Sequence, residues 1–480
     1  MRHHTIPQHK TQNIRTWEDD PGTPPSARAP IQRPTPDLDR QPLPVGVAGP
    51  RPRQSGDFPG TPEFRYWAAA DALSRSTGFW GPLMPDGLTW HPTVGRALTA
   101  ELDVGDDLNA FYDRQGLSFF HHTVAGVTVH SGESSEIVCH EVGHAVLDTL
   151  CPQLWSAASA EAAALHESFG DISAILSALS VESLVDGALV ETQGDPGKSS
   201  RLSRLAEELG WAIRQQAPGA VDPDCLRNAA NDFFYKDPVG LPPNAPAGQL
   251  SSEPHSFSRV FTGAFLEALA GVYRQQQNRD TTGLAQAGEV MGRLLVAGLT
   301  ATPVVPGIFA QTAAHMITAD QALYGGEHSP ALRAAFVRHG IMAPSTAASV
   351  TEAAPRFAAA VSDAASGSGP AREETLSDVT VPAEHYGLTE EFAVHAPTQP
   401  PRFAVSGADP ATGSLRPAEP ARAAVSFVED LFRQGRVAVP DDYLTQNATL
   451  IDGARPRTHE ITRDLRSGQL TLDRVLLTVV

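Results

Sequence analysis

The spacing of apolar residues predicts strands first and then helices between about residues 100 and 340. The segments LSFFHH (117–122) and GVTVH (126–130) combine β-branched and aromatic residues with nearby glycine, a composition typical of strands. The next segment, SSEIVCHEVGHAVLDTL (134–150), has apolar residues at helical spacing and a serine that can cap its first turn. We expect this helix to end at Pro152, which cannot continue it.

A second helix is predicted from Ser159 to Leu179, where Leu, Ile and Phe recur at helical spacing. Further helices are expected at about 201–217, 256–276, 281–299, 307–323 and 330–339. Strands followed mostly by helices favour an α+β fold. We expect a strand-rich N-terminal lobe (61–155) that contains the helix 134–150, and a helical C-terminal lobe (156–342).

The ends of the chain differ from this middle part. Residues 1–60 are rich in Pro, Arg and Gln and cannot bury enough apolar surface to offset chain entropy, which predicts a disordered Pro-rich tail. Residues 343–417 are rich in Ala, Ser and Pro and are interpreted as a linker. Periodicity returns at 418–480, where ARAAVSFVEDLFRQG predicts a helix closed by Gly435 and LTLDRVLLTVV predicts a strand. The sequence indicates no role for this small C-terminal module.

The chain of 480 residues has a formal net charge of −19. Neutralising phosphate needs clustered Lys and Arg, so this charge argues against nucleic acid and against an anionic membrane as partners. No stretch reaches the roughly 18 apolar residues that span a bilayer. The first residues lack the apolar region of a signal peptide, so we expect a cytoplasmic protein or export by a non-classical route. The three cysteines, Cys139, Cys151 and Cys225, do not suggest a disulfide framework.

The helix 134–150 carries the motif HEVGH (140–144), of the type H-E-x-x-H. Two histidines four residues apart project from one face of a helix and can share one Zn²⁺. The motif also recurs by chance on exposed polar faces. In this chain the rest of the helix is apolar, so the three polar side chains stand where packing would not favour them. Cys139, beside the motif, is interpreted as a small buried residue rather than as a ligand.

Glu167, in HESFGD (166–171), is the candidate third ligand. Asp171 follows one helical turn later, and two carboxylates at this spacing repel each other by roughly a few tenths of a kcal/mol. A nearby cation, or a histidine that donates to one of them, removes the objection. We therefore expect Glu167 to bind zinc and Asp171 to accept a hydrogen bond from a ligand histidine. The alternative is an ordinary solvated acidic face.

Three protein ligands, His140, His144 and Glu167, would leave the fourth position on zinc to water, as in catalytic sites. Zinc lowers the pKa of such a water from about 15.7 towards about 7. Glu141 is then expected to take the proton as a general base and to pass it to a leaving amine. The oxyanion that develops on the carbonyl needs a further donor.

These motifs, with others over roughly residues 100–340, resemble the thermolysin-type peptidases, the Glu-zincin branch of the zinc proteases. The helix motif is similar to the zinc helix of that family, and HESFGD is similar to its third-ligand segment. LNAFYD (108–113) resembles the family's edge-strand segment. This resemblance implies that Asn109 and Ala110 bind the main chain of the substrate.

Two further segments extend the resemblance. CLRNAAND (225–232) is similar to a segment whose arginine contacts a substrate carbonyl, which implies this role for Arg227. EPHSFSRVF (253–261) is similar to the segment whose histidine stabilises the tetrahedral intermediate, which implies this role for His255. From the residues alone, a solvated arginine and a histidine that caps a helix remain open alternatives.

The resemblance implies a two-lobed fold with zinc in the cleft between the lobes and a peptide or protein as substrate. The chain departs from the family pattern at His166, where the family has Asn, and at Gly170, where it has Ser. The family's oxyanion-binding Tyr has no clear match, and Trp155 is the nearest residue with an N–H to offer. Only Glu136 matches the acids of the family's paired calcium site, so calcium is doubtful.

The sequence therefore predicts a zinc-dependent endopeptidase, with Glu141 as the base and His255 as the oxyanion donor. A first alternative is a catalytically weak or inactive protease-like binding module that keeps the zinc site. A second alternative is an effector or toxin delivered by a non-classical route, with its terminal segments as recognition elements.

Overall fold

The computed structural model describes residues 13–25, 28–53, 58–352, 354, 376–397, 419–446, 448, 450 and 456–480. Its helices are α1 Pro62–Trp80, α2 Ser135–Leu150, α3 Gln153–Ser156, α4 Ala160–Ala178, α5 Glu182–Glu191, α6 Glu207–Gln216, α7 Pro254–Gln275, α8 Thr281–Ala301, α9 Ile308–Tyr324, α10 Ser329–Arg338 and α12 Pro420–Arg433. Its strands are β1 Asn13–Thr16, β2 Ile31–Pro34, β3 Val45–Val47, β4 Leu98–Glu101, β5 Ala110–Tyr112, β6 Leu117–Phe119, β7 His121–Val124, β8 Val127–His130, β9 Arg204–Leu205, β10 Arg227–Asn228, β11 Leu376–Val381, β12 Phe392–Pro397, β13 Val437–Ala438, β14 His459–Arg463, β15 Leu470–Arg474 and β16 Leu477–Thr478.

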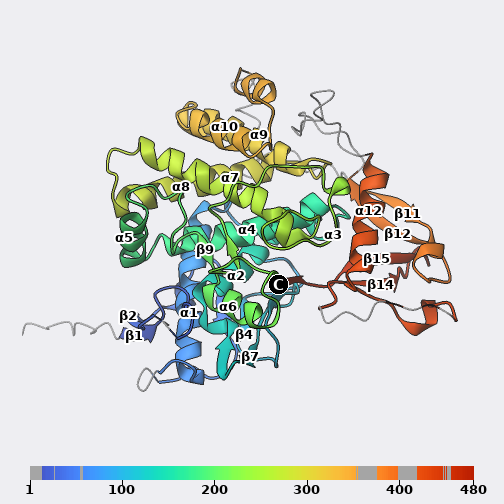
Figure 1. Cartoon of the computed structure of the whole chain (residues 1–480), viewed down its shortest axis with the longest axis horizontal. Helices are drawn as coiled ribbons and strands as arrows, with labels where there is room; N and C mark the ends of the chain where they lie inside the picture. Colours follow the sequence, from blue (N-terminus) through green and yellow to red (C-terminus); the bar gives the residue numbers. More distant parts are fainter. Residues whose placement is uncertain are drawn as a thin grey trace, which may run out of the picture.

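The fold is mixed α+β, with strands concentrated in the N-terminal region and helices through the middle (Figure 1). This part of the prediction is confirmed. A five-stranded sheet has the order β16-β5-β6-β4-β3, in which β5 is antiparallel to β6. The strands β7 and β8 pair as an antiparallel hairpin in the region where the sequence predicted strands.

The helices α2 and α4 begin at the serines that the sequence indicated. The hydroxyl of Ser134 accepts a hydrogen bond from the N–H of Ile137, and the hydroxyl of Ser159 accepts one from the N–H of Ala162. The other predicted helices lie within a few residues of α7, α8, α9 and α10. The helix predicted at 201–217 is shorter, because residues 204–205 form β9 and α6 starts only at Glu207.

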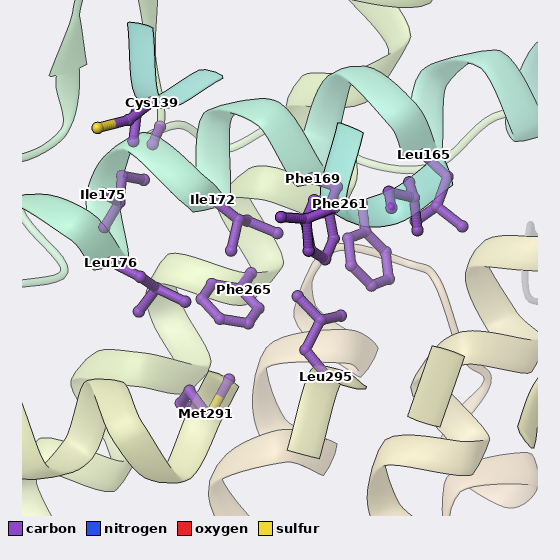
Figure 2. Close-up of a cluster of buried hydrophobic side chains, with 14 of the residues drawn as sticks. Cys139, Leu165, Phe169, Ile172, Ile175, Leu176, Phe261, Phe265, Met291 and Leu295 are labelled. Carbon is purple, nitrogen blue, oxygen red and sulfur yellow. The ribbon is translucent and has the colours of Figure 1, made fainter. Parts of the chain in front are cut away.

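Figure 2 shows the core around α4, where this helix packs against α7 and α8. The labelled side chains are buried, and they are Leu165, Phe169, Ile172, Ile175 and Leu176 from α4, Phe261 and Phe265 from α7, Met291 and Leu295 from α8, and Cys139 from α2. Burying one large apolar side chain of this kind contributes roughly 1.5–3 kcal/mol. Dense packing of these side chains fixes the position and rotation of α4, and with them the direction of Glu167 and Asp171.

The predicted disorder of residues 1–60 is wrong for the described part of that segment. The strands β1 and β2 pair with each other, and Ile14 packs against Trp67 and Ala70 of α1. The ring of Trp17 meets the ring of Phe64 edge-on, with centroids 5.4 Å apart. The segment lacks a core of its own, but it folds because α1 supplies the apolar surface that its composition lacks. Residues 1–12, 26–27 and 54–57 of the predicted tail lie outside the described residues.

The prediction of a linker over 343–417 is wrong at 376–397, where β11 and β12 form a hairpin. These strands join β13, β14 and β15 in a second five-stranded sheet with the order β11-β12-β15-β14-β13. The predicted C-terminal helix is present as α12, and Gly435 follows it with a φ of 66°. We call this sheet with α12 the C-terminal domain.

The single strand predicted in LTLDRVLLTVV is divided between two sheets. Its first half is β15 in the C-terminal domain, and its second half is β16, which pairs antiparallel with β5 of the N-terminal sheet. Figure 1 shows this last segment, in red, leaving the C-terminal domain and ending at the centre of the molecule. The chain thus returns to its own N-terminal sheet.

No single described helix is long and apolar enough to cross a membrane. The helices α4 and α5 are long and apolar enough only when they are taken together, and the chain bends by 104° between them.

Candidate functional site

The three predicted zinc ligands lie together in the interior. His140 and His144 project from α2, Glu167 projects from α4, and all three side chains are buried. Oε2 of Glu167 lies 3.4 Å from Nε2 of His140 and 3.8 Å from Nε2 of His144. One potential ligand atom from each residue lies within 4.8 Å of the other two, so the group has the dimensions to hold a metal ion.

The polar atoms of this group lack partners of their own. Nε2 of His140 and both ring nitrogens of His144 are buried without a hydrogen bond among the described residues. Leaving a buried polar atom unpaired costs roughly 1–3 kcal/mol. A cation between the three side chains would satisfy these lone pairs, and two imidazoles with one carboxylate are a donor set that binds zinc. The residues therefore fit a metal.

The charge balance of the group also favours a cation. Burial lowers the pKa of His144 to about 3, so its imidazole is in the neutral form that binds metals. Burial alone lowers the pKa of His140, but the neighbouring carboxylates of Asp171 and Glu167 outweigh it and raise the pKa to about 9. Burial raises the pKa of Glu167, yet the positive charge of His255 holds it well below its usual range. Two ionised carboxylates thus attract positive charge to this point, and the raised pKa values of His140 and His255 show the chain's own groups responding to it.

Two glycines allow α2 and α4 to approach closely enough for their ligands to meet. A Cβ on Gly170 would lie 2.6 Å from Cε1 and from Nδ1 of His140, closer than real Cβ atoms come. A Cβ on Gly143 would lie 2.7 Å from Cβ of Ser173 and 3.0 Å from Cα of Gly170. The position where the chain departs from the family's Ser is thus one where only glycine fits this orientation of His140.

Asp171 lies behind His140, as the sequence predicted. Its Oδ1 accepts a hydrogen bond from Nδ1 of His140 at 3.1 Å. The same carboxylate receives the guanidinium of Arg227, whose Nη2 lies 3.0 Å from Oδ1 and whose Nε lies 3.3 Å from Oδ2. Burial raises the pKa of Asp171, but the charge of Arg227 and the contact with His140 lower it to about 2. Asp171 therefore joins the candidate ligands to Arg227.

Glu141 is fully buried beside the ligands. Neither of its carboxylate oxygens has a hydrogen-bond partner among the residues that the structure describes. Burial raises its pKa to about 8, although the charges of His140 and His255 oppose this shift. A carboxylate with a pKa near the working pH can both accept and return a proton.

His255 is held by a residue that the sequence did not single out. Its Nδ1 lies 2.6 Å from Oε1 of Glu253, and its Nε2 lies 3.2 Å from Oε2 of Glu167. Burial lowers the pKa of His255, but the negative charges of Glu167 and Glu253 outweigh it and raise the pKa to about 10. Both ring nitrogens therefore carry hydrogen, and Nε2 is 2.5 Å from the main-chain oxygen of Thr478. The sequence could have indicated Glu253 only by its position two residues before His255.

The predicted substrate-binding residues border a cavity of about 320 Å³, whose lining includes Asn109, Arg227, His255, Arg436 and Val480. Ala110 belongs to β5, the strand next to this lining. Arg436 and Val480 were not predicted, because they come from the C-terminal domain and the segment after it. The sequence carries no signal that this domain would reach the cavity.

Trp155 does not offer its N–H to the metal group. Its indole N–H donates to the main-chain oxygen of Arg474 at 3.0 Å, and Nε of Arg474 donates to the main-chain oxygen of Trp155 at 2.9 Å. The ring centroid of His166 lies 5.7 Å from that of His144, and both nitrogens of His166 are buried without a hydrogen bond in the described part of the chain. Burial holds the pKa of His166 well below its usual range, so it is neutral.

Glu136, the one match to a calcium site, lies among buried groups at the start of α2. Its Oε2 accepts a hydrogen bond from the N–H of Ala206 at 2.6 Å. The neighbouring carboxylates of Asp19 and Glu207 are paired with Arg75 and Arg28 respectively. At this place Arg28 and Arg75 of the chain supply the positive charge that a calcium ion would bring.

A second group of candidate ligands, Asp103, His121 and His130, lies at the surface of the N-terminal region. The guanidinium of Arg65 lies 2.9 Å from Nε2 of His130 and 3.4 Å from Oδ2 of Asp103. A fixed positive charge at this place competes with a cation, so the buried group is the better candidate.

Comparison with models of protein families finds no match for this chain, and comparison with curated proteins finds none either. The geometry of the buried group is therefore the basis of the functional proposal.

Proposed function

We propose that this chain is a zinc-dependent endopeptidase of the thermolysin type, with a two-lobed fold and with His140, His144 and Glu167 as ligands. The observation that carries the proposal is the unpartnered carboxylate of Glu141, buried beside three candidate ligand atoms that lie within 4.8 Å of one another. A structural metal site would need the ligands but would not need this carboxylate. Its isolation in the interior costs stability, and a role in chemistry explains why it stands there.

Zinc at this site would act as a Lewis acid on the substrate carbonyl and lower the pKa of a water. Glu141 would take a proton from the attacking water as the new C–O bond forms. It would then return this proton to the amide nitrogen as the C–N bond breaks. Burial raises the pKa of Glu141, which makes it a stronger base than an exposed glutamate.

The remaining residues would position the peptide. His255, protonated at both nitrogens, would donate from Nε2 to the carbonyl oxygen that gains negative charge. Arg227, held by Asp171, would donate to the next carbonyl along the peptide. Asn109, which precedes β5, and Ala110, its first residue, would bind the peptide main chain.

The test replaces Glu141 with Gln, which keeps the size of the side chain and removes the base. We expect zinc content to stay the same and cleavage of a generic fluorogenic peptide to fall by about 100-fold or more, because general bases contribute roughly 10²–10⁴. The control is Glu182→Gln, which alters an exposed glutamate on α5. Undiminished cleavage by Glu141→Gln would contradict the proposed base.

The alternative, a binding module that keeps the metal site, is favoured by one observation. The segment Leu477–Val480 of the chain itself lies against β5 and the candidate oxyanion donor. A protein that holds zinc but cleaves no peptide, even after this segment is removed, would support the binding module.

A further inference from the structure

The last residues of the chain lie where an extended peptide would bind. The strand β16 adds to the free edge of β5 in antiparallel register, with Leu477 opposite Tyr112 and Thr478 opposite Phe111. The N–H of Val479 donates to the main-chain oxygen of Ala110 at 3.0 Å. Strand addition at a sheet edge is a common way for proteins to bind peptides, because the main chain supplies the hydrogen bonds.

The predicted peptide-binding side chains are engaged by this same segment. Nε2 of His255 contacts the carbonyl oxygen of Thr478 at 2.5 Å, and Nη1 of Arg227 donates to the carbonyl oxygen of Val479 at 2.9 Å. The hydroxyl of Thr478 donates to Oδ1 of Asn109. Two successive carbonyls are thus held by the two donors that were assigned to a substrate's carbonyls.

The segment is also buried and held at its far end. Leu477, Thr478 and Val479 are each exposed by no more than 2%. Beyond them, Nη2 of Arg436, from the C-terminal domain, donates to the main-chain oxygen of Val480 at 3.2 Å. A peptide substrate therefore cannot reach the donors while the segment is in place.

The C-terminal domain keeps the segment close to the cleft. Only two residues separate β16 from Arg474, the last residue of β15, which exchanges hydrogen bonds with Trp155. The next residue, Val475, donates its N–H to the main-chain oxygen of Thr458 at 2.9 Å. A short tether gives an effective concentration in the millimolar range, so a segment with weak intrinsic affinity still occupies the site.

We propose that residues Leu477–Val480 are an intramolecular ligand of the cleft, which competes with extended peptides and keeps the full chain self-inhibited. The effect on rate rests on the proposed peptidase function, whereas the competition for binding does not. The ligand class of the cleft is then an extended peptide that adds a strand to β5 and presents two successive carbonyls to His255 and Arg227.

The experiment compares the full chain with a chain that ends at Val475. Both carry Glu141→Gln in the binding arm, so that the probe is not cut. The probe is a fluorescein-labelled peptide with the sequence RVLLTVV, which is that of residues 474–480. We expect its anisotropy to rise with the shortened chain at concentrations at least tenfold lower than with the full chain.

The activity arm uses the same pair with Glu141 intact and a generic fluorogenic peptide. We expect the shortened chain to have a kcat/KM at least tenfold higher than the full chain. Adding RVLLTVV should raise KM and leave kcat unchanged, because the peptide competes with substrate for one site.

The removed residues belong to the core, so thermal unfolding must show that the shortened chain is folded. If it is not, the full chain with Val479→Pro replaces it, because proline lacks the N–H that bonds to Ala110. The matched control is Leu465→Ala in the C-terminal domain. Leu465 is 98% exposed, so this variant should behave as the parent chain.

The two proposals fail in different ways. If peptide binds only after the segment is removed but neither chain cleaves, the peptidase is refuted and the intramolecular ligand stands. If the folded shortened chain, or the Val479→Pro chain in its place, binds RVLLTVV no more tightly than the full chain, the segment is an ordinary structural strand and the inference is overturned.

Discussion

The two walls of the candidate site are held together in different ways. The metal wall consists of two adjacent helices, α2 and α4, and their ligands are fixed by a dense apolar core and a close contact at Gly143 and Gly170. The peptide wall is assembled from β5, Arg227, His255 and the segment Leu477–Val480, which are distant in sequence. They are joined by hydrogen bonds and by the burial of Leu477 and Val479. Changes in the first wall should abolish function, and changes in the second should adjust access to it.

The largest expected effect is on the metal wall, from Glu167→Ala. Removing this carboxylate leaves two histidines and takes away the negative charge that draws a cation to the site. We expect loss of bound zinc, measured by inductively coupled plasma spectrometry, and loss of peptide cleavage. A chelator should bring the parent chain to the same low activity, and zinc should restore the parent but not the variant. Full zinc occupancy in Glu167→Ala would show that the ligand set is wrong.

A smaller but still large effect is expected from Gly170→Ala, which adds one methyl group between the helices. The new Cβ would lie 2.6 Å from the ring of His140, so the ring must move. A displacement of about 1 Å at such a site costs about 100-fold in rate. The matched control is Gly78→Ala in α1, where the new Cβ would meet no atom within 4 Å apart from its chain neighbours and the backbone of its own helix.

Gly78→Ala should leave cleavage and zinc content unchanged and stabilise the fold by about 0.4–1 kcal/mol, read from chemical denaturation. If the two alanine variants have equal activity, the contact between the helices does not position His140.

The smallest of the three effects is expected from Asp171→Asn, the residue that touches both walls. Asparagine keeps the shape of the side chain but loses the charge that binds Arg227 and orients His140. Replacing such a supporting group typically lowers metal affinity by about 10–100-fold. Competition with a zinc-binding dye measures the affinity. Because Arg227 is freed as well, binding of the RVLLTVV probe to the shortened chain should also weaken. A change in zinc affinity alone would show that the two walls are independent.

Much of the metal wall was accessible from the sequence because its features are local. Four-residue spacing places His140 and His144 on one side of a helix, and a serine before each helix marks where it begins. The pairing of Asp171 with His140 followed from the repulsion that two carboxylates on one helix would otherwise suffer. The role of Gly170 was missed, because a close approach between helices leaves no periodic pattern.

The errors lie where one segment depends on the surface of another. The segment from residue 13 to residue 53 has too few apolar residues to fold alone, but Ile14 and Trp17 pack against apolar side chains of α1. The stretch 376–397 follows an Ala- and Ser-rich run and forms strands because three later strands complete its sheet. Composition measures what a segment can bury by itself and carries no information about what a distant partner offers.

The sequence by itself indicated the candidate ligands, the candidate base and the α+β class, because helical periodicity and residue chemistry are properties of short stretches. Only the tertiary structure decided where the last segment of the chain lies. Strand residues do occur in LTLDRVLLTVV, but they form two strands in two sheets, because strand propensity does not specify a partner. The free edge of β5, the donors His255 and Arg227, and the tether through Arg474 together direct β16 to the cleft. The physical reason is that hydrogen bonds between distant main chains form only after packing has placed both strands.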